Sequence, residues 1–226
     1  MNVHAWMVGL AGLSLVAACT EPATAPGDRD LGGIAPSADW TYGGSNQATE
    51  QHILVEQDAA PPLEAYYREF WAVAGKSRSF TIRYKAAWRD REHDEEDDAP
   101  TFWRLSLGEH SLRALPDGTP LADGDSVLIS VTVDPSRLIV DMGPDALQFD
   151  PDEPARLTLF YGYANPDVDR DGDVDRDDDA IKASRLSIWF RANEQSPWEK
   201  VSAWHDRERQ RFHAFIDHFS GYTVSW

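Results

Sequence analysis

The sequence is poor in cysteine and in positive charge. It has one cysteine among 226 residues, and 21 Lys and Arg against 39 Asp and Glu give a net charge of −18. A single cysteine excludes a disulfide bond within the chain. The scarcity of cations argues against a nucleic-acid partner, because a phosphate backbone is bound by clustered Lys and Arg. The excess of acid is typical of a cation-binding protein or of a soluble protein outside the cytoplasm.

Long hydrophobic runs are also missing. The apolar stretch at residues 5–18 is too short to cross a bilayer as a helix and fits the hydrophobic region of a signal peptide, although no Lys or Arg precedes it. The stretch ends in LVAAC, which resembles the lipobox of bacterial lipoproteins. The resemblance implies that Cys19 is lipidated and becomes the mature N-terminus. The alternative is an ordinary signal peptide with an incidental cysteine.

These features divide the chain into three predicted parts. Residues 1–18 are expected to be a lipoprotein signal peptide. Residues 19–38 begin with the lipidated cysteine and continue as a flexible tether, because they are rich in Pro, Ala and Gly without apolar periodicity. Residues 39–226 have enough apolar and aromatic residues to form a folded domain. The expected location is therefore extracytoplasmic, in the bacterial cell envelope, with the membrane as a partner through Cys19.

The folded part is expected to consist of β-strands. Apolar and polar residues alternate in many short segments, as where Phe80, Ile82 and Tyr84 share one face, and Gly, Pro and Asp turns separate these segments. This pattern predicts an all-β fold, an antiparallel Ig-like β-sandwich or an open barrel. Residues 64–73 are expected to be a strand with a bulge. The other expected strands lie at residues 102–107, 126–133, 137–142, 155–161, 185–190 and 211–219.

The second half of the chain resembles a known kind of module. The stretches GPDALQF, WEKV and HFSGYTV are similar to corresponding runs in the ZU5-like β-sandwich modules of bacterial surface lipoproteins. The resemblance covers about residues 125–226. It implies a sandwich fold and no active site. Asp145 departs from the pattern, which often has His at that position.

Catalytic motifs are not evident. His218 and Ser220 are close in the sequence, but the strained turn that exposes a hydrolase nucleophile is missing, and we interpret both as structural residues. No H-E-x-x-H motif, cysteine cluster or phosphate-binding glycine loop occurs. We therefore expect a protein that is not an enzyme, with an extracellular hydrolase as a minor alternative. The charged run at residues 88–100 is interpreted as a solvated hairpin tip.

Residues 165–180, NPDVDRDGDVDRDDDA, contain eight aspartates. Ca²⁺ prefers six to eight hard oxygen ligands, and a 12-residue loop supplies them from positions 1, 3, 5, 7, 9 and 12 with Gly at position 6. With position 1 at Asp167, Gly172 falls at position 6, and Val174 at position 8 is expected to anchor the loop to the core. The predicted ligands are Asp167, Asp169, Asp171, Asp173 through its carbonyl, Asp175 and Asp178.

The same pattern resembles the calcium loop of dockerin and related EF-hand-like modules. Only one loop is present and it follows a strand, so the resemblance implies a calcium loop inserted between two sandwich strands and followed by a short helix. Ile181 is expected to fill the apolar role that Asp179 cannot. Crowded carboxylates repel one another unless a cation neutralises them, which favours Ca²⁺ as cofactor over the alternative of a solvated acidic loop.

Two functions are compatible with these features. The first is a membrane-tethered, non-enzymatic sandwich that Ca²⁺ stabilises and that presents a surface to an unidentified protein or glycan partner. The second is a Ca²⁺-dependent adhesion or carbohydrate-binding module, in which exposed aromatic rings stack on the ligand. Its candidate stacking residues are Trp40, Trp71, Trp88 and Trp198.

Overall fold

The computed structural model describes residues 50–85 and 100–226. All of them fall in one unit of the chain, residues 41–226. The predicted signal peptide, Cys19, the tether and residues 88–99 of the charged run lie outside the described residues. No helix in the described ranges is long and apolar enough to cross a membrane.

The described residues form two antiparallel sheets. The larger has six strands in the order β1-β5-β6-β13-β9-β10, and the smaller has five in the order β11-β12-β8-β3-β2. The strands of the larger sheet are β1 (Tyr67–Val73), β5 (Ser126–Asp134), β6 (Ile139–Gly143), β13 (Gly221–Ser225), β9 (Ser187–Arg191) and β10 (Glu199–Lys200). Those of the smaller sheet are β11 (Ala203–Asp206), β12 (Arg211–Ile216), β8 (Ala155–Phe160), β3 (Thr101–Leu107) and β2 (Arg78–Arg83).

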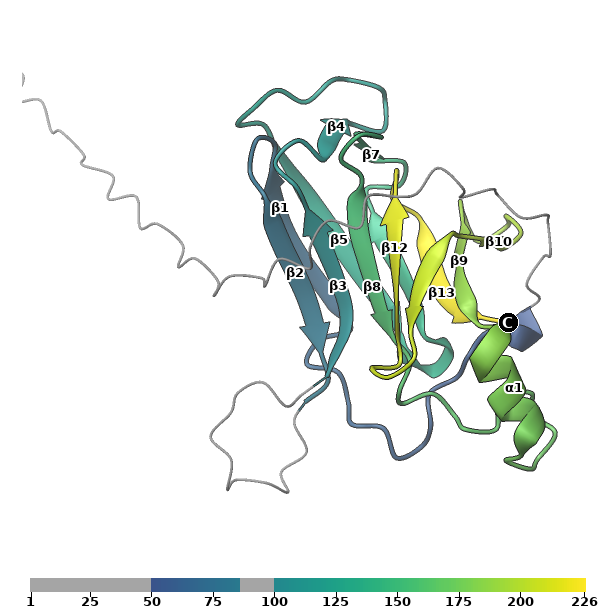
Figure 1. The fold of residues 1–226 in the computed structure, drawn as a ribbon. Helices are drawn as coiled ribbons and strands as arrows, with labels where there is room; N and C mark the ends of the chain where they lie inside the picture. Colours follow the sequence, from purple (N-terminus) through teal and green to yellow (C-terminus); the bar gives the residue numbers. More distant parts are fainter. Residues whose placement is uncertain (1–49, 86–99) are drawn as a thin grey trace, which may run out of the picture. The chain divides into compact units, whose positions relative to one another are not determined.

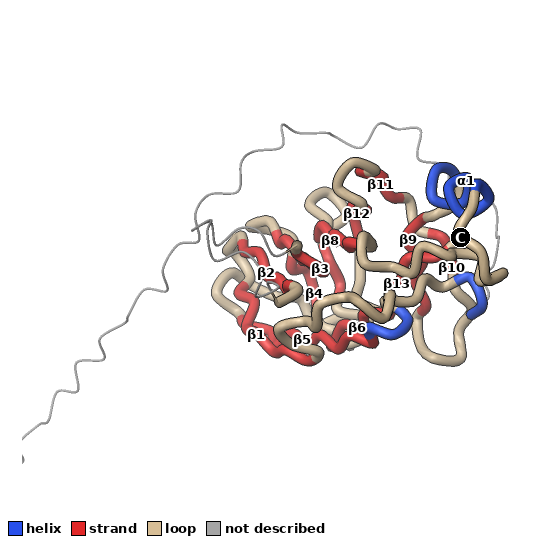
Figure 2. Tube along the Cα trace, turned by 90° about the horizontal axis from the view of Figure 1, so that it is seen from below, coloured by secondary structure: helices blue, strands red, loops and turns tan. Residues whose placement is uncertain are grey.

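The two sheets stack as a β-sandwich, which confirms the expected fold class (Figures 1 and 2). A two-stranded ribbon of β4 (Leu112–Ala114) and β7 (Gln148–Phe149) lies at one end of the sandwich. Two short 3-10 helices, Glu50–His52 and Pro135–Arg137, and one α-helix, α1 (Arg176–Ser184), complete the described structure. Figure 2 shows α1 at one end of the sandwich, close to the C-terminus.

Alternation of side chains explains how the core forms. Along β5, Ile129 and Val131 are fully buried, whereas Leu128, which points to the opposite face of the sheet, is 40% exposed. Inward residues of both sheets join in a single hydrophobic cluster. Burial of apolar surface contributes roughly 25 cal/mol per Å², so this cluster is the main source of stability.

Two strands depart from the expected alternation. Every residue of β13 is buried, and in β9 Trp189 is buried although Ile188 is the residue that faces the core. The reason is a second, smaller cluster on the outer side of this sheet, formed by Ile53, Ile139, Trp189 and Trp198. The segment before β1 thus covers a sheet face that the sequence pattern leaves open.

The strand expected at residues 64–73 is present as β1. Its pairing with β5 is continuous from Tyr67 opposite Thr132 to Val73 opposite Ser126, so the expected bulge is wrong. A register shift occurs instead between Ile82 and Arg83, where β2 pairs with β3. The strand expected at residues 211–219 is shorter, because β12 ends at Ile216.

Candidate metal centre

The aspartate-rich segment connects β8 to α1, and its last residues start the helix. The Asp175 side chain accepts a hydrogen bond from the Asp177 amide at 2.8 Å, while the Asp178 side chain accepts one from the Asp175 amide at 2.9 Å. The Asp175 side chain also accepts from the Asp178 backbone, so Asp175 and Asp178 form a capping box, and the acidic first turn suits the positive end of the helix dipole. The short helix expected after the loop is therefore confirmed.

Three of the predicted ligands lie together. Asp167, Asp169 and Asp171 each place a carboxylate oxygen within 4.8 Å of the others. The loop curls around them because backbone amides donate inward: the Gly172 amide to Asp167 Oδ2 at 3.2 Å and the Asp173 amide to Asp171 Oδ1 at 2.9 Å. The three carboxylates consequently face one small volume, as a cation site requires.

Two features of this cluster indicate unsatisfied negative charge. Asp167 Oδ1 is buried and has no hydrogen-bond partner, although buried polar atoms are nearly always paired. The pKa of Asp169 is raised, first by desolvation and then by the nearby charges of Asp171, Asp178 and Asp167. A cation among these oxygens would remove both penalties.

Asp178 stands in the first turn of α1, where backbone amides bond to its carboxylate. Its side chain is buried, and it accepts hydrogen bonds from the amides of Val168 at 2.5 Å, Asp169 at 3.4 Å and Asp175 at 2.9 Å. These bonds, first that from Asp175, lower its pKa. Asp178 therefore closes the loop through backbone amides and is not part of the three-carboxylate group. Asp173 and Asp175 are exposed and also lie outside that group.

The loop is anchored to the core by residues other than Val174. Val174 is 63% exposed, so its predicted anchoring role is wrong, whereas Val168 is 4% exposed and belongs to the core cluster. The expected role of Ile181 is confirmed, because it is 5% exposed in the same cluster. Both valines stand between aspartates, and only packing distinguishes them. Gly172 has a φ of +102°, which confirms it as the turn residue.

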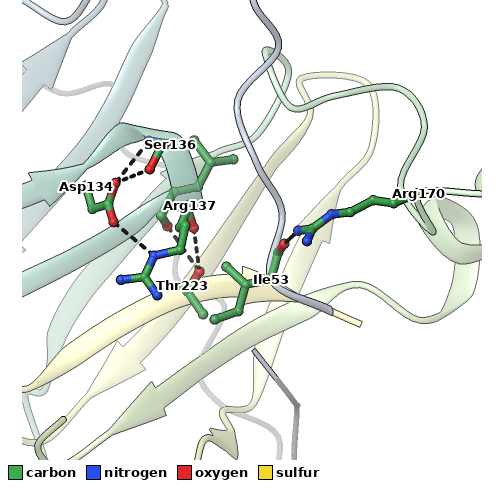
Figure 3. Close-up of polar contacts among 7 residues, drawn as sticks. Ile53, Asp134, Ser136, Arg137, Arg170 and Thr223 are labelled. Carbon is green, nitrogen blue, oxygen red and sulfur yellow. Dashed lines mark hydrogen bonds and ion pairs between the residues drawn. The ribbon is translucent and has the colours of Figure 1, made fainter. Parts of the chain in front are cut away.

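Arg170, for which the sequence predicted no role, bonds the loop to the segment that precedes β1. Its guanidinium donates a hydrogen bond to the carbonyl of Ile53, a contact drawn in Figure 3. Ile53 in turn forms a bridge with Ser225 at the end of β13. From the helix side, Lys182 Nζ donates to the Pro166 carbonyl at 2.8 Å. Arg170 thus ties the middle of the acidic loop to the segment before β1, and Lys182 ties the helix to the start of the loop.

The strand that Ile53 joins, β13, also bonds to the turn between β5 and β6 through a side chain. Thr223 Oγ1 in β13 donates to the Leu138 carbonyl at 3.1 Å, and Arg137 forms an ion pair with Asp134 at 3.0 Å (Figure 3). Arg170 therefore links the acidic loop, through Ile53, to the end of β13 in the larger sheet.

Among the described residues, His218 and Ser220 are not hydrogen-bonded to each other. His218 Nδ1 contacts Asp217 at 2.6 Å, and Ser220 Oγ is buried without a hydrogen-bond partner. The Tyr222 hydroxyl donates to the His218 carbonyl at 2.9 Å and so bonds the start of β13 to the turn before it. Of the stacking candidates, Trp71 is 58% exposed but Trp198 is only 3% exposed, so Trp198 cannot stack on a ligand. Trp40 and Trp88 lie outside the described residues.

Comparison with known proteins gives no relative. No family model matches the chain, and no curated protein and no solved structure is significantly similar to it. The resemblance to ZU5-like modules therefore stays a prediction.

Proposed function

We propose that residues 165–180 bind one Ca²⁺ ion and that the protein is a non-enzymatic β-sandwich module stabilised by it. The observation that carries the proposal is the buried, unpartnered Asp167 Oδ1 beside the carboxylates of Asp169 and Asp171. Carboxylate and carbonyl oxygens in a flexible loop are the ligands that Ca²⁺ prefers, whereas Mg²⁺ demands stricter octahedral geometry.

The donor set fits such an ion. Asp167, Asp169 and Asp171 would hold it, and the Asp178 carboxylate beneath the loop has lone pairs beyond those that accept amides. Asp173 and Asp175 are proposed to contribute a carbonyl and a carboxylate or water-bridged oxygen. The bound charge would offset repulsion among the aspartates and stiffen the segment between β8 and β9.

The cellular setting is part of the same proposal. We infer a lipid anchor on Cys19, a tether over residues 19–38 and an extracytoplasmic, ZU5-like sandwich beyond it. The support is the lone cysteine after LVAA and the Pro-, Ala- and Gly-rich segment that follows. A cation site of modest affinity suits an extracellular environment, where calcium-binding modules work at high micromolar to millimolar dissociation constants.

Thermal unfolding with and without Ca²⁺ tests the calcium site. A ligand that binds only the folded state stabilises it by about 2.7 kcal/mol at 100 times its dissociation constant. We expect about 10 mM Ca²⁺, roughly 10 to 100 times such a dissociation constant, to raise the melting temperature of the full chain by several degrees and Mg²⁺ to have less effect. Asp171→Asn should abolish the shift, whereas the matched change Asp177→Asn, at an exposed aspartate outside the group, should retain it. An unchanged melting temperature at millimolar Ca²⁺ would contradict the proposal.

A further inference from the structure

The outer surface of the smaller sheet carries exposed rings and positive charge. Figure 2 shows β11, β12, β8 and β3 side by side, on the side of the sandwich away from β5 and β6. Ala214, Leu157 and Leu105 of these strands point into the core, so their chain neighbours point outward. We call this surface the Trp204 face. Its residues, paired across the strands, are Trp204, His213, Thr158 and Arg104 in one row and Phe215 and Arg156 in the next.

The rings of this face are both open to solvent and held in place. Trp204 is 50% exposed and stacks on His213, with ring centroids 5.0 Å apart and planes 20° apart. His213 Nδ1 is in turn 3.0 Å from Thr158 Oγ1. Phe215 is 44% exposed, and the Arg156 guanidinium lies 6.0 Å from its ring centroid. Large exposed rings fixed by neighbours are typical of ligand-stacking platforms.

The charge of the Trp204 face is opposite to that of the chain. Arg104, Arg156 and Arg211 project from it, whereas the acid at its edge, Asp206, is engaged by Arg209 Nη1 at 3.3 Å. All three arginines act on His213, whose pKa is lowered to about 4 by burial first and then by these charges. A chain of net charge −18 therefore concentrates cations on one sheet surface.

We propose that the Trp204 face binds an acidic polysaccharide. Sugar rings present C–H faces that stack on Trp204 and Phe215, and guanidinium groups pair with carboxylates in a fixed geometry. An acidic peptide is a weaker match, because it offers carboxylates to the arginines but no flat C–H ring faces to stack on Trp204 and Phe215. The proposal does not depend on the calcium loop, which lies on a different segment.

Binding of polygalacturonate to the full-length chain tests this proposal. The measurement is made at low ionic strength with EDTA present, so that calcium at the aspartate loop plays no part. We expect measurable affinity that falls with added salt and no affinity for neutral dextran. Trp204→Ala and the double change Arg104→Gln, Arg156→Gln should each weaken binding roughly tenfold, about 1.4 kcal/mol. Trp71→Ala, at a tryptophan of similar exposure on the larger sheet, is the matched control and should bind like the wild type.

Several results would overturn the proposal. One is that the wild type does not bind polygalacturonate although its melting temperature shows that it is folded. Another is equal binding of polyglutamate that Trp204→Ala does not change, which would identify an acidic peptide as the occupant. Self-association abolished by Arg156→Gln would identify a second copy.

Discussion

At the scale of single residues, the aspartates of one loop have three different roles. Asp167, Asp169 and Asp171 converge on one volume, Asp175 and Asp178 cap a helix, and Asp177 is exposed. All of these residues are aspartates, so their different roles come from the direction in which the local backbone points each side chain. The positive φ at Gly172 lies between the residues that converge and those that cap.

Asp178 is expected to be the aspartate on which folding depends most. Asp178→Ala removes an acceptor for three amides, and we expect a loss of about 3 kcal/mol in the free energy of unfolding, measured by urea denaturation without Ca²⁺. Asp177→Ala is the matched control and should change stability by less than about 0.5 kcal/mol. Equal effects of the two changes would contradict the loop-closing role.

The pKa of Asp178 also sets the direction of its pH dependence. Its pKa is lower in the folded state than its ordinary value of 3.8. The stabilisation is therefore complete above that ordinary value and is lost as the pH falls through the lower, folded-state pKa. The destabilisation caused by Asp178→Ala should shrink in that acidic range.

At the scale of elements, the loop and α1 are held to the sandwich by apolar contacts that flank the acidic cluster. Val168 enters the core before the cluster and Ile181 after it, while Val174 points to solvent. Alternating Asp and Val do not reveal which valine is buried, because a loop has no fixed period. The prediction that failed at Val174 depended on a position in a resembling loop and not on packing in this one.

Matched valine substitutions test this assignment. Val168→Ala removes two buried methyl groups, and at about 0.8 kcal/mol per buried carbon plus a cavity contribution we expect a loss of roughly 2 kcal/mol. Val174→Ala removes the same atoms from an exposed position and should be neutral within about 0.5 kcal/mol. Chemical denaturation of both variants gives the comparison, and a larger loss at Val174 would refute it.

At the scale of the whole molecule, charge is distributed unevenly. Acid is concentrated in the loop before α1, while arginines surround His213 on the smaller sheet. Burial and these arginines lower the pKa of His213 from 6.5 to about 4. Between pH 4 and pH 6.5 the unfolded chain therefore binds more protons at His213 than the folded chain does. The free energy of unfolding consequently falls as the pH is lowered from about 6.5 toward 4.

Replacing the histidine tests the contribution. His213→Gln cannot take up the proton, so the stability difference between pH 7 and pH 5 should be smaller in the variant than in the wild type. Urea midpoints at the two pH values measure it. The same pH dependence in both proteins would show that His213 is not held neutral by its surroundings.

Much of the architecture follows from local pattern. Period-2 alternation with Gly, Pro and Asp turns predicted most strands and the sandwich, and the spacing of Asp, Gly and Ile predicted the turn at Gly172 and the helix after it. The order of strands did not follow, because alternation is the same whichever strand lies alongside.

Sequence by itself therefore determined most of the longer strands, the turn at Gly172 and the helix, since turns, capping and alternation act between near neighbours in the chain. Tertiary structure decided which side chains are buried and which side chains from distant segments come into contact. Ile53 buries Trp189 and receives Arg170 across 117 residues, and Trp204 meets His213 and the arginines only through strand pairing. Such contacts join segments whose separation along the chain carries no local signal, so neither the burial of Val168 nor the Trp204 face could be read before the strands were placed.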